Sequence, residues 1–160
     1  MTRAAIDAEI RAARYPGHSP ERWALPLLDQ IDRQSSGWSL VALEEAEFGE
    51  LWVPAHQGEP CHGDRMMLGT ATDGMRLRDA ATWLKLNQEA YAAANTSCWG
   101  RIALAARQPR SPIVVAPYSV GDRIKPPDAP LVIVDGLHRA LGFWSSGRRT
   151  CEAYLPAVAG

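Results

Sequence analysis

A short run near the C-terminus, Asp135-Gly136-Leu137-His138-Arg139, combines side chains that can bind phosphate and metal ions. Arg139 carries a planar guanidinium that fits phosphate oxygens, and His138 can donate a hydrogen bond to the same anion. Asp135 can ligate Mg²⁺ or accept a proton from a hydroxyl group. Gly136 lets a ligand approach the backbone closely. This spacing indicates a site for phosphate binding.

The elements that must position this run can be read from the flanking residues. The apolar stretch Leu131–Val134 is typical of a buried strand. Leu137, Leu141 and Trp144 then recur at helical spacing, and Gly147 should end that helix. A strand followed by a glycine turn and a helix leaves free amides at the helix start, where the helix dipole favours an anion.

A purely structural interpretation of the same residues stands beside this one. Asp135 could cap the helix, His138 could be a surface histidine, and Arg139 could pair with an acid. The residue types and spacing alone do not separate the two interpretations.

The N-terminal 36 residues predict helices. Thr2 can cap a helix that carries Ile6 and Ile10 on one face, and Pro20 is typical of a second helix start. Pro26 should kink or delay that second helix. Residues 1–36 are therefore predicted to form a helical N-terminal extension to a domain formed by residues 37–160.

The remainder of the chain alternates between strand and helix patterns, with the acidic segment Glu44–Glu47 expected to be a turn. Helical spacing runs from Leu77 to Tyr91, and a further helix is expected after Asn95, Thr96 or Ser97. The predicted fold class is α/β (α+β), a small mixed sheet with packed helices. The remaining predicted strands are Trp38–Leu43, Leu51–Val53, Ile113–Ala116 and Cys151–Leu155.

Composition limits the class of protein. The formal net charge of −1 provides no overall field for gathering nucleic acid, so DNA is an unexpected partner. No stretch is apolar enough for an export signal or a membrane span, and three widely spaced cysteines do not suggest a disulfide framework. A cytoplasmic protein without a membrane partner is expected. The sequence does not indicate an oligomeric state.

A long segment without periodicity gathers four residues of metal-ligand type: His56, Cys61, His62 and Asp64. No second cluster completes a zinc-binding spacing, and side chains of adjacent residues rarely converge on one ion. The alternatives are a polar lid over the pocket or a solvated loop.

The run Asp135–Arg139 and its flanking elements resemble the ParB/sulfiredoxin superfamily, in which an Asp-Gly-x-His-Arg-type motif opens a helix that holds nucleotide phosphates. The resemblance covers residues 97–156, and the segment Trp38–Pro54 could supply the first strand of that fold. It implies that Gly136, Leu137, His138 and Arg139 bind the nucleotide, and that Asp135 acts in catalysis and binds Mg²⁺.

Two branches of that superfamily fit poorly. Sulfiredoxins place a reactive cysteine where this chain has Leu137, so peroxiredoxin repair is not expected. Chromosome-partitioning members follow the motif with a helix-turn-helix module, and the residues after Arg139 are too few for one.

The motif is closest to that of the free-serine-kinase branch, in which an upstream glutamate assists phosphoryl transfer. Glu47 and Glu50, together with Asp135 and His138, are the candidate catalytic residues here. The function expected is therefore transfer of a phosphoryl group from ATP or ADP, with CTP as a further nucleotide to test, to a small hydroxylated or amino-acid-like molecule. The alternatives are a non-catalytic ligand-sensing or partner-docking module, or an enzyme that does not use nucleotide. A pocket plugged by Trp52 or Trp144 would favour a binding or structural role.

Overall fold

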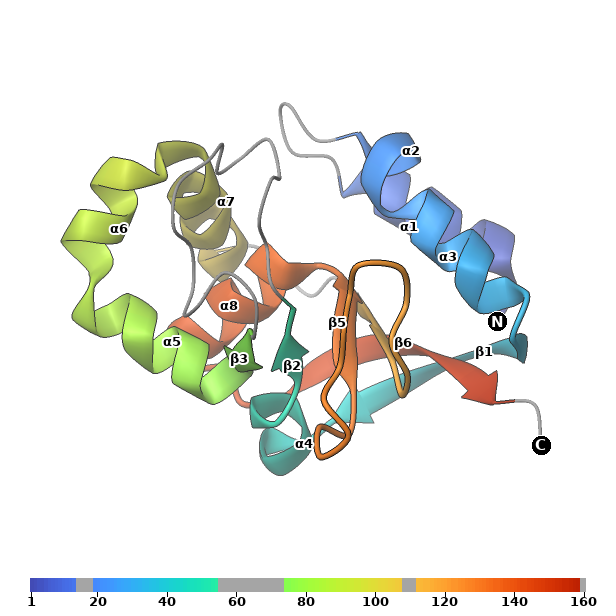
Figure 1. The fold of residues 1–160 in the computed structure, drawn as a ribbon. Helices are drawn as coiled ribbons and strands as arrows, with labels where there is room; N and C mark the ends of the chain where they lie inside the picture. The colour runs from blue at the N-terminus through green and yellow to red at the C-terminus, as the bar shows by residue number, and fades with distance from the viewer. Residues whose placement is uncertain (14–18, 55–73, 108–111, 159–160) are drawn as a thin grey trace.

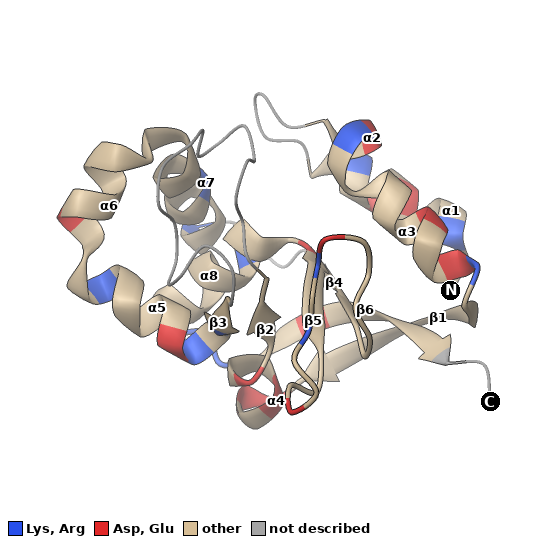
Figure 2. Ribbon diagram, viewed as in Figure 1, with Lys and Arg blue, Asp and Glu red and all other residues tan. Residues whose placement is uncertain are grey.

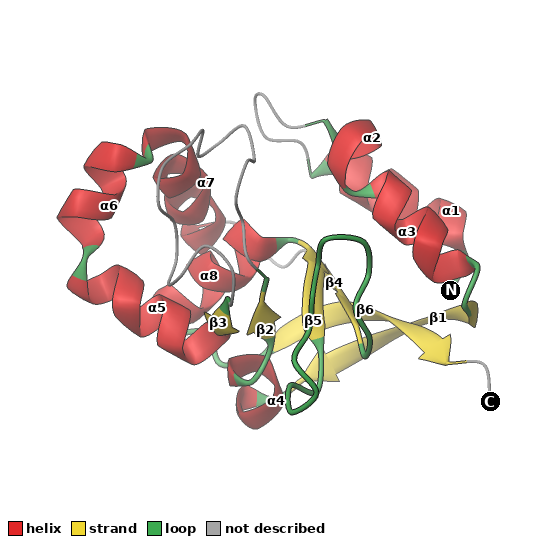
Figure 3. Cartoon of the chain, in the orientation of Figure 1, coloured by secondary structure: helices red, strands yellow, loops and turns green. Residues whose placement is uncertain are grey.

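The computed structural model describes residues 1–13, 19–54, 74–107 and 112–158. Across these ranges the chain folds into one mixed α/β arrangement, as predicted. Six strands form a single sheet, with helices on both of its faces (Figure 1, Figure 3). In spatial order the strands are β1 (Ser35–Leu43), β6 (Cys151–Val158), β4 (Ile113–Ala116), β5 (Val132–Asp135), β2 (Trp52–Val53) and β3 (Met75–Arg76).

The sheet mixes parallel and antiparallel pairs. The parallel pairs are β4 with β6 and β2 with β5, while β1–β6, β4–β5 and β2–β3 are antiparallel. The central strands β4 and β5 are buried on both faces, which explains their continuous apolar sequence. Ile113 and Ile133 contact one helical layer, whereas Val114 and Val134 contact the other, as the two-residue repeat of a strand requires.

The N-terminal helices cover one face of the sheet. Their buried residues Ile6, Ile10 and Leu28 belong to the same hydrophobic cluster as Val134 and Tyr154 of the sheet. The segment predicted as an extension is thus part of the domain core. Thr2 caps the first helix, and the helical structure is interrupted between the second and third helices, just before Pro26. These helices are α1 (Arg3–Ala12), α2 (Pro20–Trp23) and α3 (Leu25–Asp32).

The other face is covered by a second helical layer. It contributes Phe48, Leu84, Ile102 and Leu141 to a cluster that also holds Ile133 of β5. The helices are α4 (Glu45–Gly49), α5 (Leu77–Leu86), α6 (Gln88–Ala94), α7 (Thr96–Arg107) and α8 (Leu137–Ser145). The sheet is therefore the middle layer of three.

Two details of this layer correct the expectation from sequence. The acidic segment predicted as a turn begins helix α4, because Glu44 and Glu47 form a capping box in which Glu47 accepts the Glu44 backbone N–H at 3.1 Å. The continuous helical spacing from Leu77 to Tyr91 is interrupted at Asn87. The Asn87 side chain donates to the Trp83 carbonyl at 2.9 Å, and such local bonds compete with helix continuation.

Two weakly acidic side chains buried in the sheet, Tyr154 and Cys151, make the stability of the fold depend on pH. Burial raises the pKa of the Tyr154 phenol, with its hydrogen bond to Glu9 as a second cause, and burial raises the pKa of the Cys151 thiol to about 12. Their ordinary values are 10.0 and 9.0. Both groups hold their protons more tightly when folded, so the stability they provide is complete below pH 9 and is lost as the pH rises through the folded-state pKa values.

We therefore predict that the free energy of unfolding declines between pH 8.5 and 11. Tyr154→Phe removes one of the two groups, so the decline should be shallower in this variant even though it loses the bond to Glu9. Urea unfolding at several pH values measures both slopes. Equal slopes for the two proteins would contradict the assignment.

Candidate functional site

The strand–turn–helix predicted around Gly136 is confirmed. Strand β5 ends at Asp135, Gly136 adopts a left-handed conformation with φ of 91°, and α8 begins at Leu137. The N-cap residue Gly136 has no side chain to cap this helix start, and its carbonyl accepts the Ala140 N–H at 2.9 Å. The first amides of α8 therefore lie where the helix dipole favours a negative charge.

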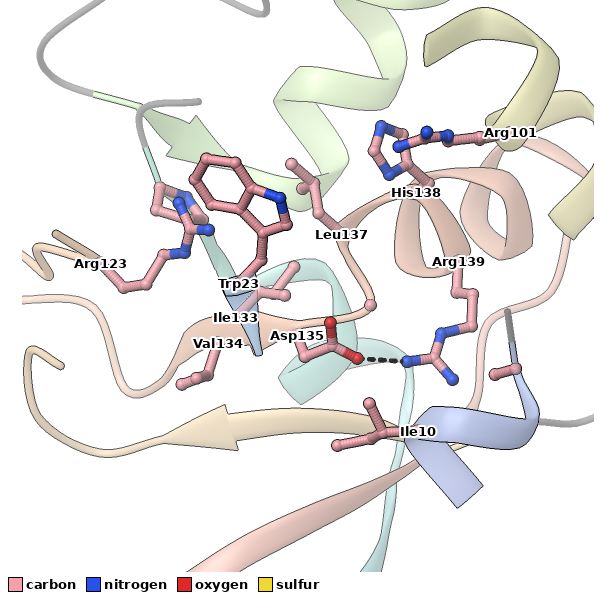
Figure 4. Close-up of a pocket in the computed structure, with 13 residues that line it drawn as sticks. Ile10, Trp23, Arg101, Arg123, Ile133, Val134, Asp135, Leu137, His138 and Arg139 are labelled. Carbon is pink, nitrogen blue, oxygen red and sulfur yellow. Dashed lines mark hydrogen bonds and ion pairs between the residues drawn. The ribbon is translucent and has the colours of Figure 1, made fainter. Parts of the chain in front are cut away.

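Asp135 and Arg139 form an ion pair across this turn. Arg139 Nη2 lies 2.7 Å from Asp135 Oδ2, and Arg139 is only 5% exposed (Figure 4). The guanidinium packs directly over the glycine: a Cβ atom on Gly136 would lie 3.0 Å from Arg139 Nε and 2.7 Å from Ile113 Cγ2. The ion pair therefore requires a glycine here, for its space as well as its φ.

A pocket opens beside the ion pair. It is lined by Asp135 and the start of α8, and by two further arginines, Arg101 from α7 and Arg123 from the connection between β4 and β5 (Figure 4). Arg139 reaches the same pocket from α8. Three guanidinium groups from three parts of the chain thus line one pocket, in which Arg139 contacts Asp135, while Arg123 also lies 3.5 Å from Asp122. The lining has a cationic character that suits an anion.

The opposite wall of the pocket comes from the N-terminal helices. Ile10, Ala13 and Trp23 line it, together with Pro54 after β2. Trp23 is stacked under Arg22, whose Cζ lies 4.8 Å from the indole centroid. The pocket therefore combines apolar and aromatic side chains with cationic ones, an arrangement typical of small-molecule sites.

His138 contacts a pair of buried side chains in the second helical layer through one of them, Cys98. Its Nε2 lies 3.1 Å from the Cys98 thiol, and that thiol lies 2.9 Å from the Tyr91 hydroxyl. Cys98 and Tyr91 are buried, while His138 lines the pocket. The three side chains form a continuous chain of polar contacts from the helical core to the pocket.

The two glutamates predicted to assist catalysis do not join this site. Glu47 closes the capping box of α4, and Glu50 pairs with Arg76 at 3.5 Å and also with Arg78. Trp52 of β2 pairs in parallel with the first residue of β5, so Glu50 lies at the opposite end of the strands from Asp135. Neither glutamate is among the described residues that line the pocket, and their assignment to catalysis stays a prediction.

Other side chains singled out from sequence also lie elsewhere. Trp144 packs on Phe48 of α4, and Trp52 is absent from the pocket lining. Arg149 pairs with Glu45 at 3.3 Å and stacks on Trp144, at the far end of α8 from the pocket. The pocket is thus not plugged by either tryptophan.

The proposed metal-ligand residues His56, Cys61, His62 and Asp64 lie outside the described residues. Within the described part of the chain, no group of three or more His, Cys, Asp or Glu side chains could hold a metal ion. In those same ranges no helix has the length and hydrophobicity needed to cross a membrane.

Sequence reasoning missed the pocket residues Arg101, Arg123 and Trp23, and it missed the contact of Cys98 with His138. Arg101 follows Cys98 by three residues on one helix, so a shared face could have been inferred once either was suspected. No signal of spacing or composition links Arg123 or Trp23 to residues 135–139. Tertiary packing alone brings them together.

The fold and the pocket define a class: a three-layer mixed α/β domain with a cationic pocket at a strand–turn–helix. The chain belongs to DUF6309, a family of unknown function, which matches residues 18–160. No curated protein and no solved structure matches this chain. The resemblance to the ParB/sulfiredoxin superfamily stays a prediction.

A glycine substitution tests the turn that forms the site. Gly136→Ala forces a side chain into a left-handed conformation and against Ile113 and Arg139, so we expect a loss of about 2 kcal/mol or more in unfolding free energy. Gly100→Ala is the matched control. Its added Cβ would meet nothing within 4 Å, and alanine should stabilise helix α7 by up to about 1 kcal/mol. Thermal unfolding compares the two, and similar melting temperatures would contradict the described turn.

Proposed function

We propose that this protein binds the phosphate groups of a nucleotide, ATP or ADP, in the pocket where β5 joins α8. We further propose that it transfers a phosphoryl group to a small hydroxylated or amino-acid-like molecule. The observation that supports this most is the convergence of Arg101, Arg123 and Arg139 on the first turn of α8. The motif resemblance described above points to the same ligand.

The charge balance of the pocket suits phosphoryl transfer. This reaction needs positioning and neutralisation of negative charge more than covalent chemistry by the protein. Arg101 and Arg123 reach the pocket from separate elements, so they can contact different phosphate groups of one ligand. The amides at the start of α8 add fixed positive dipoles that need no reorganisation during the reaction.

Asp135 and His138 divide the remaining roles. One carboxylate oxygen of Asp135, Oδ2, accepts from Arg139, and Oδ1 can ligate Mg²⁺ or accept the proton of the substrate hydroxyl. Bound Mg²⁺ would supply further charge neutralisation on the phosphates. The substrate oxygen forms a bond to phosphorus while the bond to the leaving phosphate oxygen breaks, and the hydroxyl proton passes to Asp135. His138 donates a hydrogen bond to the anion.

A second candidate function is a module that binds the same ligand without catalysis. It is favoured by one observation: Asp135 is the only carboxylate among the described residues that line the pocket, and it is already paired with Arg139. A site with a single engaged acid can bind an anion without providing a strong base.

Titration calorimetry with ATP, ADP and CTP in the presence of Mg²⁺ tests the binding step. Charge-assisted hydrogen bonds contribute about 1.5–3 kcal/mol, so Arg101→Gln and Arg123→Gln should each weaken binding by about tenfold or more. Arg78→Gln is the matched control, because it removes the same charge from a residue that pairs with Glu50 away from the pocket. An equal loss in the control would indicate a non-specific charge effect, and no heat with any of the three nucleotides would end the proposal.

Product analysis tests the transfer step. The protein, ATP and Mg²⁺ are incubated with a mixture of hydroxylated amino acids and related small molecules, and mass spectrometry is used to find a phosphorylated product. Asp135→Asn keeps a hydrogen-bond acceptor for Arg139 but removes the base, so product should fall at least a hundredfold. Thermal unfolding and nucleotide titration of the same variant show how much of this fall comes from lost stability or lost binding. Nucleotide binding without any product from the unmodified protein would instead support the second candidate function.

A further inference from the structure

The contact between His138 and Cys98 links the pocket to a buried polar chain. Tyr91 of α6 places its hydroxyl 2.9 Å from the Cys98 thiol, and the thiol lies 3.1 Å from His138 Nε2. These residues come from three successive regions of the second helical layer: α6, the first turn of α7, and the first turn of α8. Neither Cys98 nor Tyr91 lines the pocket.

We propose that Cys98 and Tyr91 are positioning residues, which fix the imidazole of His138 in one orientation and one tautomer so that its Nδ1 edge serves the ligand. Cys98 is 1% exposed, so its thiol cannot contact a ligand in the pocket. Cys98 reaches the pocket lining through its contact with His138.

The backbone keeps the two helices at the distance that this contact needs. Helices α7 and α8 pack closely, because Gly142 of α8 lies against the backbone of α7. A Cβ on Gly142 would lie 2.6 Å from the Ile102 carbonyl oxygen and 2.8 Å from the Ala106 nitrogen. Such a close approach leaves little freedom for the helices to slide, so Cys98 meets His138 at a fixed place.

The chemistry of the three groups sets the direction of the hydrogen bonds. A phenol is the strongest neutral donor of the three, a neutral imidazole nitrogen is a good acceptor, and a thiol is weak in both roles. The favourable order is therefore Tyr91 O–H donating to Cys98 Sγ, and the Cys98 S–H donating to His138 Nε2. This order puts the ring proton on Nδ1, where it can be donated to an anion.

The tautomer of His138 can be measured directly. The chain has four histidines, so a sample labelled with ¹⁵N in histidine gives few ring signals, and His138→Gln identifies those of His138 by their loss. In the unmodified protein we expect Nδ1 to carry the proton and Nε2 to be unprotonated. Cys98→Ala removes the donor and should shift the His138 ring signals toward a mixture of tautomers.

A comparison of Cys98→Ala with Cys98→Ser separates positioning from packing. Serine keeps a hydroxyl that can donate to Nε2, so it should preserve the His138 signals and the affinity for ATP–Mg²⁺ within about threefold. Alanine should weaken that affinity by about tenfold, the effect typical of losing a residue that orients a histidine ligand. A packing role predicts the reverse order, because alanine fits an apolar core better than serine. Tyr91→Phe should fall between the two.

Cys151→Ser is the matched control. Cys151 is also buried, but it lies in β6 and its thiol donates to the Glu152 carbonyl at 3.2 Å. This variant should lower the melting temperature and leave the His138 ring signals unchanged.

The inference rests on the proposed function only for the affinity measurement, and the two can fail separately. If no protein binds any nucleotide, the proposed function fails while the ring signals still decide the role of Cys98. Ring signals that are unchanged in Cys98→Ala, or that change equally in Cys98→Ser, would overturn the inference.

Discussion

The ion pair between Asp135 and Arg139 is the interaction on which the pocket depends. A buried guanidinium without a partner is strongly destabilising, by about 3–5 kcal/mol when one member of such a pair is lost. Arg139 is almost fully buried, and Asp135 is the carboxylate that neutralises it. Because both side chains leave the chain on either side of Gly136, the ion pair also fixes where β5 ends and α8 begins. The orientation of the first α8 amides follows from that constraint.

Local charge and overall charge differ in this protein. The whole chain is nearly neutral, and its charged residues are spread over both helical layers (Figure 2). Three arginines and one aspartate nevertheless line the same pocket. A low-dielectric setting increases the effect of each of those charges, so a neutral protein can still attract a small anion. A near-neutral net charge is therefore compatible with a small cationic site.

The three-layer arrangement explains why polar and apolar side chains reach the site from different helical layers. The second helical layer supplies Arg101 and His138, whose polar groups face the pocket. The N-terminal layer supplies Ile10 and Trp23 from α1 and α2, which close the pocket with apolar surface. A ligand bound between them would be held by charge on one side and shielded from water on the other, which strengthens the electrostatic contacts.

Much of the architecture could be predicted because its signals are local. The apolar runs of β4 and β5, the Thr2 cap and the break before Pro26 each depend on a few neighbouring residues. Local signals gave a wrong prediction at a place where two local patterns compete. Glu44–Glu47 has the composition of a turn but forms a capping box at the start of α4, and Phe48 of that helix is buried in the core.

The sequence by itself determined the strand, the glycine turn and the helix that carry Asp135, His138 and Arg139. Those features follow from backbone preferences and hydrophobic periodicity over about ten residues. Only the tertiary structure decided which partners surround them. Because β2 and β5 run parallel, Glu50 lies at the opposite end of the strands from Asp135. The packing of α7 on α8 places Arg101 at the pocket and Cys98 against His138. Contacts between residues far apart in sequence depend on how whole elements pack, and no local pattern encodes that packing.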